Sequence, residues 1–157
     1  MQQKRYANAD EVTIASGGST TLLITNNELN RMNVHGIRYK GRLRADNVSA
    51  DNEAHGFIIL MAHPASYTFA ASDFTNNTEL EDASDWIIAV EPWSIFGGST
   101  NPVGFGTFYD WEMVINSSRT LRKDAILRAV VLSQTGSAKS VIVTNHLLSC
   151  FGTQAKL

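Results

Sequence analysis

Residues 109–151 have the sequence YDWEMVINSSRTLRKDAILRAVVLSQTGSAKSVIVTNHLLSCF, and their pattern is the strongest indication of the fold. They contain three segments with strand-like patterns, separated by two polar turns. In the first segment, residues 109–115, apolar side chains occupy every second position, and Asp110 and Glu112 stand between them. A period of two with polar residues at the intervening positions is typical of a strand that is buried on one face.

The other two segments are also predicted strands, and the three together are expected to pair as an antiparallel sheet. Residues 125–132 are apolar at nearly every position except Arg128, and a short continuous apolar run of this kind predicts a strand covered on both faces. The polar, glycine-containing residues 134–137 predict a turn, and residues 140–150 predict the returning strand. We therefore expect a protein built from β-sheets.

The rest of the chain continues in the same way. The total is about eight strands without a full amphipathic helix, which predicts an all-β sandwich or barrel. Gly36 and Gly41 are expected bend or bulge points, and Pro64 and Pro92 are expected to end strands. One helical turn is expected near residues 79–83. The further predicted strands are residues 11–15, 20–25, 32–45, 56–62 and 85–90.

The bulk composition fits one globular domain. The chain has 157 residues, of which 43% are hydrophobic and 18% charged. We expect a short flexible segment at residues 1–10 and a single domain over residues 11–157. The single cysteine, Cys150, excludes an internal disulfide framework. No apolar run is long enough to span a membrane, and the N-terminal residues have no secretory pattern.

A row of cations is the sharpest local feature. If residues 32–45 form a strand, Arg38, Lys40, Arg42 and Arg44 share one face. One interpretation is a solvated face, with the cations paired across strands to Asp110 and Glu112, and this interpretation is favoured. The other is a surface that faces phosphates. The net charge of −2 gives the whole molecule no nucleic-acid signature, so such binding would need a local patch.

The sequence carries no catalytic or metal-binding signature. The glycine-rich residues 97–106 match neither a P-loop nor a dinucleotide fingerprint. No Gly-x-Ser-x-Gly motif is present. The histidines have no spacing that predicts a zinc site; they are His35, His55, His63 and His146. We therefore expect no enzyme activity, no cofactor and no metal.

Two stretches carry a resemblance. The aromatic strand that enters residues 118–124, SRTLRKD, resembles the C-terminal third of single jelly-roll capsid proteins from small circular single-stranded DNA viruses. The ending SVIVTNHLLSCF, residues 140–151, is similar to the final strand of small satellite-virus capsid proteins. The likeness covers about the last third of the chain.

The resemblance implies an eight-stranded antiparallel jelly-roll sandwich that assembles into an icosahedral shell, of about sixty copies, in a virion. Many such proteins carry a long arginine-rich N-terminal arm, which here is reduced to Lys4 and Arg5. Contact with viral nucleic acid is therefore expected to be weak and non-specific. The residues implied in that contact are Lys4, Arg5, Arg38, Lys40, Arg42 and Arg44.

Two other functions remain open for this architecture. A lectin-like or trimeric jelly-roll module would bind a ligand through its loops, with the acids of residues 79–85 as the first candidates for calcium. A cupin-type enzyme would need two or three of the histidines and a carboxylate to converge inside the barrel. The low charge and the lack of a catalytic motif favour a structural coat subunit over both.

Overall fold

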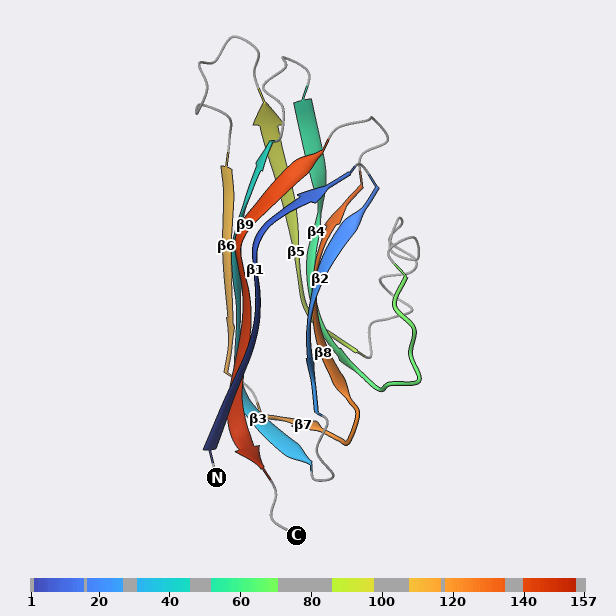
Figure 1. Cartoon of the computed structure of the whole chain (residues 1–157), viewed down its shortest axis with the longest axis vertical. Coiled ribbons are helices and arrows are strands. Elements are labelled where there is room, and N and C mark those ends of the chain that lie inside the picture. The colour runs from blue at the N-terminus through green and yellow to red at the C-terminus, as the bar shows by residue number, and fades with distance from the viewer. Residues whose placement is uncertain are drawn as a thin grey trace.

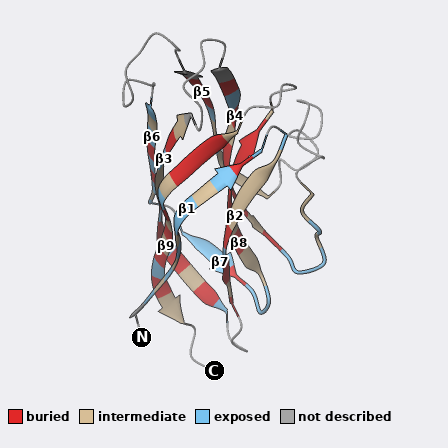
Figure 2. Cartoon of the chain, turned by 45° about the horizontal axis from the view of Figure 1, so that its top comes forward, coloured by how far each residue is buried: buried red, intermediate tan, exposed pale blue. Residues whose placement is uncertain are grey.

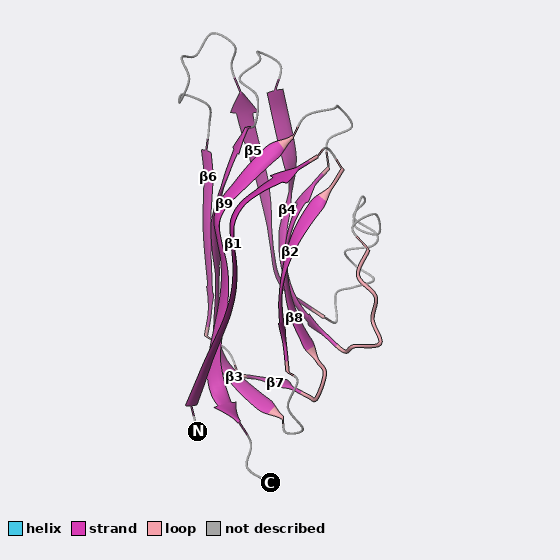
Figure 3. Ribbon diagram, viewed as in Figure 1, coloured by secondary structure: helices cyan, strands magenta, loops and turns pink. Residues whose placement is uncertain are grey.

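The structure is a computed structural model of the chain. It describes residues 2–15, 17–26, 31–45, 52–70, 86–97, 108–116, 118–134 and 140–154. These residues form strands, turns and loops, with no helix among them (Figure 3).

The strands form two antiparallel sheets packed face to face (Figure 1). Sheet A has the order β1 (Gln2–Ile14), β9 (Val141–Gln154), β3 (Met32–Ala45) and β6 (Phe108–Ile115), and the short β7 (Arg119–Leu121) also pairs with β3. Sheet B has the order β2 (Ser19–Thr25), β8 (Ile126–Ser133), β4 (Asn52–His63) and β5 (Ile87–Gly97).

The pairing is nested along the sequence. β1 pairs with β9, β2 with β8, β3 with β6 and β4 with β5, so the chain resembles one long hairpin. Rolling this hairpin brings β9 against β3 in one sheet and β8 against β4 in the other. Two sheets in this order form a jelly-roll sandwich. The predicted all-β jelly-roll fold class is confirmed.

Two strand boundaries differ most from the sequence prediction, and residues 119–121 form the short β7 in addition to the eight strands expected. β1 begins at Gln2 and pairs with β9 from there, so residues 2–10 lie in a strand where we expected a flexible segment. β5 continues through Pro92 to Gly97, although we expected Pro92 to end it. β5 is an edge strand, where the missing N–H of proline leaves no neighbouring strand without a partner. The helical turn expected at residues 79–83 lies outside the described residues.

The main core lies between the sheets, and sheet B has a second one on its outer face. Ile59, Met61, Val130 and Leu132 form this second cluster, against which the partly buried Tyr67 and Phe69 pack. β8 is consequently buried along nearly its whole length (Figure 2). The prediction that residues 125–132 form a strand covered on both faces is confirmed.

The two predicted bulges are also present. The register between β3 and β9 shifts between Val34 and Gly36, and again between Lys40 and Arg42. At Gly41 a Cβ atom would lie 2.4 Å from the Trp111 ring, so only glycine leaves room for this indole. Opposite the second shift, Asn145 of β9 adopts a positive φ of 53°. The first shift adds a residue on β3 at His35 and the second adds one on β9 opposite Gly41, and the sheet continues through both.

Candidate functional site

The outer face of sheet A carries the predicted row of cations on β3, which we call the basic stripe: Arg38, Lys40, Arg42 and Arg44. Arg38 lies between Ser149 of β9 and Val114 of β6 in one row across the sheet. Lys40 lies in the next row, beside Glu112. On the same strand Ile37, Tyr39 and Leu43 are buried in the core. The expected separation of β3 into a cationic face and a buried face is therefore confirmed.

Acidic residues neutralise most of the stripe. Arg38 donates to Glu112 Oε1 at 2.8 Å, and Arg42 donates to both oxygens of Asp110 at 2.6 and 3.0 Å. Arg44 lies 3.9 Å from Glu11 of β1. The hydrogen bond from Arg42 holds the pKa of Asp110 below its usual value. The predicted pairing of the cations with Asp110 and Glu112 is confirmed, and each pair is solvent-exposed.

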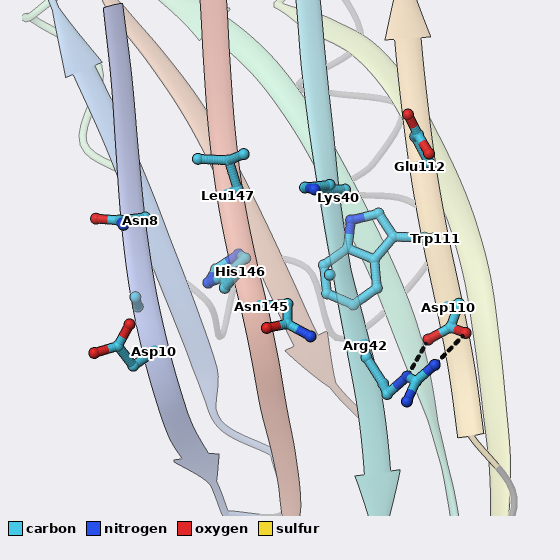
Figure 4. A pocket seen from close by; sticks show the side chains of 12 residues that line it. Asn8, Asp10, Lys40, Arg42, Asp110, Trp111, Glu112, Asn145, His146 and Leu147 are labelled. Atoms are coloured by element: carbon cyan, nitrogen blue, oxygen red, sulfur yellow. Dashed lines mark hydrogen bonds and ion pairs between the residues drawn. The ribbon is translucent and has the colours of Figure 1, made fainter.

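A shallow depression of about 520 Å³ lies along this face (Figure 4). Asn8 and Asp10 of β1 border one side, and Asp110 and Glu112 of β6 border the other (Figure 4). Both signs of charge line it. Such a surface favours contact with another mixed-charge surface over strong binding of a polyanion.

Lys4 and Arg5 face opposite ways. Lys4 is exposed and lines a smaller depression of about 220 Å³ together with Arg38 and Phe151. Arg5 points to the other side of β1, where Nη1 donates to the carbonyl of Thr25 at 3.2 Å. The structure thus brings five of the six predicted site residues onto one face and leaves Arg5 apart from them.

Apolar side chains share this face with the charges. Tyr6 is 68% exposed, Val114 56%, Phe108 49% and Phe151 42%. Tyr6, Ser149, Arg38 and Val114 stand in one row across all four strands. The row places apolar groups at the two edges of the sheet, with a polar centre between them. A non-obligate protein interface has a similar mixture of apolar and polar groups.

A buried polar cluster lies below the same strands, and no clear sequence signal predicted it. Tyr39 and His146 are 0% and 1% exposed, and the Tyr39 hydroxyl lies 2.6 Å from His146 Nε2. Burial lowers the pKa of His146 to about 4 and raises that of Tyr39. Among the described residues, His146 Nδ1 and Trp111 Nε1 have no hydrogen-bond partner. A histidine within an apolar strand was the only sequence feature that pointed here.

A second cluster holds residues 63–69 against the outer face of sheet B. His63 Nδ1 donates to the Pro64 carbonyl at 2.9 Å, and Nε2 accepts from Arg128 Nε at 3.0 Å. The Arg128 guanidinium lies 4.9 Å from the Phe69 ring centroid. Tyr67 contacts His63 and Trp86 with its ring. Both ring nitrogens of His63 are engaged in these hydrogen bonds. We therefore interpret the cluster as a structural contact that holds this segment in place.

The described residues offer no metal centre. They contain no group of three or more histidine, cysteine or acidic side chains that could hold an ion. The acids of residues 79–85, on which the calcium-binding alternative depends, lie outside them. No helix in the described part of the chain has the length and hydropathy needed to cross a membrane.

Comparisons by sequence give no family. No family model matches the chain. No curated protein matches it either.

Comparisons by structure find distant likenesses. Dimeric latent PorU from Porphyromonas gingivalis is 11% identical with a TM-score of 0.44, and covers 94% of this chain and 13% of PorU. The infectious bursal disease virus VP2 subviral particle is 11% identical with a TM-score of 0.32, covering 99% of this chain and 38% of VP2. The Gx strain of that virus gives 13% identity and a TM-score of 0.26, covering 99% of this chain and 34% of the other.

The chain therefore spans well under half the length of each of these structures. The similar structures include proteins of virus particles, and the likeness is too slight to carry an argument about function.

Proposed function

We propose that this chain is a coat subunit that associates with copies of itself to form a small icosahedral shell. The nested jelly-roll order is one support, because this architecture is used in viral shells. The resemblance of residues 118–124 and 140–151 to small capsid proteins is a second support. Jelly rolls also serve as ligand-binding and catalytic domains, so the fold alone does not choose among them.

The observation that carries the proposal is the outer face of sheet A. Four of its large apolar side chains are between 42% and 68% exposed. They surround ion pairs and an open depression rather than an enclosed pocket. Coverage by other subunits would remove this apolar surface from water, at a gain of about 25 cal/mol per Å². A shell supplies such coverage over many copies.

Light scattering with negative-stain microscopy, at low and high salt, tests the proposal. Uniform shells of one diameter are the expected result. The absorbance at 260 nm relative to 280 nm on the same fractions reports packaged nucleic acid. A monomer or trimer that is independent of salt would overturn the shell, and a screen of sugars and metals would then test the ligand-binding module.

Contact with a viral genome is a finer part of the proposal. Lys4 and Lys40 have no ion-pair partner among the described residues, whereas Arg38, Arg42 and Arg44 have acidic partners. This arrangement supports weak, non-specific contact with a viral nucleic acid within the virion. Arg5, bound to the Thr25 carbonyl, is the least available of the six.

Charge reversal tests this part. Replacing Arg38, Lys40, Arg42 and Arg44 together by glutamate should lower the nucleic acid in purified particles. Lys123→Glu changes the charge of an exposed turn on another part of the molecule and is the control for position, with a smaller change in net charge. Unchanged nucleic-acid content in the fourfold variant, with intact particles, would remove these residues from the genome contact.

A further inference from the structure

The free edge of β1 is an unusual feature of sheet A. β1 stands at the end of the strand order and pairs with β9 only, from Gln2 to Ile14. In Figure 1 it runs along the front of the sandwich, ahead of β9. No described strand pairs with its other side. A long edge strand presents unpaired backbone N–H and C=O groups that another strand can bond.

The other edge strands offer a shorter or interrupted backbone edge for pairing. β2 has 7 residues and β6 has 8, whereas β1 has 13. β5 is long, but Pro92 in its middle cannot donate a hydrogen bond. β1 contains no proline. Its one inward-facing cation, Arg5, is bonded within its own chain, so it does not block the edge.

The side chains of β1 alternate in a way that suits a second copy. Lys4, Tyr6, Asn8 and Asp10 are exposed on the outer face. Ala7 and Ala9 are half-buried on the inner side and pack against the core. A cation therefore stands near one end of the strand and an acid near the other. Neither Lys4 nor Asp10 forms an ion pair with a described residue.

Symmetry then limits the register. A twofold axis perpendicular to the sheet pairs two β1 strands antiparallel and keeps outer residues opposite outer residues. With the axis at Ala7, Lys4 of each copy lies opposite Asp10 of the other, and Tyr6 lies opposite Asn8. With the axis at Tyr6, Lys4 meets Asn8; with the axis at Asn8, Tyr6 meets Asp10. Among the outer side chains, only the register centred on Ala7 sets unlike charges directly opposite each other. The register centred on Asn8 would set Arg5 opposite Glu11, but Arg5 is bonded to the Thr25 carbonyl and Glu11 lies beside Arg44.

We propose that two copies of this chain pair through their β1 strands, antiparallel about a twofold axis at Ala7, and so join their two A sheets into one continuous sheet. The partner is a second copy because the edge complements itself in both backbone and charge. The pairing also places Asn8 of the partner beside Tyr6, the most exposed large apolar side chain described. The β1 pairing would be one of the contacts between subunits of the proposed coat. To that extent the inference rests on the proposed function.

Charge exchange on the full-length protein tests the register. Lys4→Glu and Asp10→Lys each replace two attractive contacts by two repulsive ones and should weaken dimerisation roughly tenfold in sedimentation equilibrium. The double variant restores opposite charges and should recover wild-type association. Lys123→Glu, with the same change in net charge as Lys4→Glu, should have no effect. Single variants that associate like the wild type would overturn the register.

Disulfide trapping tests the axis. Residues directly opposite in an antiparallel pair have Cβ atoms about 4.5–5.5 Å apart, while diagonal neighbours lie about 7–8 Å apart. Ala7→Cys should therefore form an intermolecular disulfide under mild oxidation, and Asn8→Cys should not. The native Cys150 is buried and should leave the wild type uncrosslinked. Equal crosslinking of both variants, or none, would overturn the axis at Ala7.

The outcomes separate this contact from the coat function. Shells that form equally well in the wild type and in both single charge variants would overturn the β1 contact and leave the coat proposal standing. Charge-sensitive dimers that never form shells would support the contact and overturn the coat proposal. A wild-type monomer at every concentration would overturn both.

Discussion

His146 is the most deeply buried histidine among the described residues. Its side chain is 1% exposed, is bonded to the Tyr39 hydroxyl, and has a pKa lowered to about 4 by burial. The folded protein therefore holds the neutral imidazole over a range of pH in which the unfolded chain takes up a proton. Folding stability must depend on pH in that range.

We expect the free energy of unfolding to fall as the pH drops from about 6.5 towards 4. The contribution of His146 is complete above pH 6.5, and its loss amounts to about 3 kcal/mol at pH values below 4. His146→Gln should flatten this part of the profile, as measured by urea unfolding at several pH values. His35→Gln is the control because His35 is exposed. An equally steep profile in His146→Gln would contradict the assignment.

Gly56 and Gly36 differ in the kind of atom that an added Cβ atom would meet. A Cβ atom at Gly56 would lie 1.8 Å from the Leu132 carbonyl oxygen, which belongs to a paired strand. At Gly36 the obstacle at 2.2 Å is the ring of Phe151, which is 42% exposed and free to rotate outward. Backbone in a sheet cannot yield as a surface ring can.

Gly56→Ala should therefore destabilise the protein by about 3 kcal/mol and Gly36→Ala by less than about 1 kcal/mol. The shift in the urea midpoint, with the slope unchanged, measures both. Equal losses for the two variants would mean that the second sheet accommodates the methyl group by a shift of β8.

Among the elements, residues 67–69 cover part of the outer face of sheet B. Tyr67 and Phe69 pack on the second core formed by β4 and β8, and Arg128 lies over the Phe69 ring. Phe108 of β6 offers a matched comparison, because Arg42 lies 5.1 Å from its ring centroid in a similar way. Phe108, however, is 49% exposed and covers no buried cluster.

Phe69→Ala should cost about 2 kcal/mol, whereas Phe108→Ala should stay within about 0.5 kcal/mol of the wild type. The difference measures the apolar contacts beneath Phe69, since the cation–π contact is lost in both variants. Unfolding in urea at a concentration where the protein is monomeric gives the two values. A larger loss for Phe108→Ala would contradict the covering role of residues 67–69.

At the scale of the whole molecule, the nested pairing makes the fold dependent on distant contacts. Gln2 pairs with Thr153, and β9 completes sheet A between β1 and β3. Closing such long loops costs entropy before the contacts form. The protein should therefore fold much more slowly than a helical domain of its size.

Refolding should take from milliseconds to seconds, in the range of other β-sandwiches. Stopped-flow fluorescence can follow it, because Trp93 and Trp111 are 3% and 4% exposed in the folded protein. Dilute samples keep association out of the signal. Relaxation in microseconds would contradict a transition state that depends on the nested pairing.

The strand pattern and much of the local detail follow from the amino-acid sequence alone. Alternation over residues 109–115 and continuous apolar residues over 125–132 identify one-sided and two-sided burial, because side-chain direction in a strand repeats every two residues. The bulges at Gly36 and Gly41 and the face shared by the four cations follow from the same local rules. The jelly-roll order was expected from a resemblance rather than from these patterns.

How distant segments of the chain meet is seen only in the tertiary structure. Local sequence did not show that residues 2–10 are a strand, because their pairing depends on β9 at the other end of the chain. It offered Asp110 and Glu112 as partners for the stripe but did not assign them to Arg42 and Arg38. It did not find the contact between Tyr39 and His146, which are far apart in sequence and adjacent only after the hairpin has rolled up. Register and strand order are long-range properties, and they fix the surface that we propose copies of the chain share.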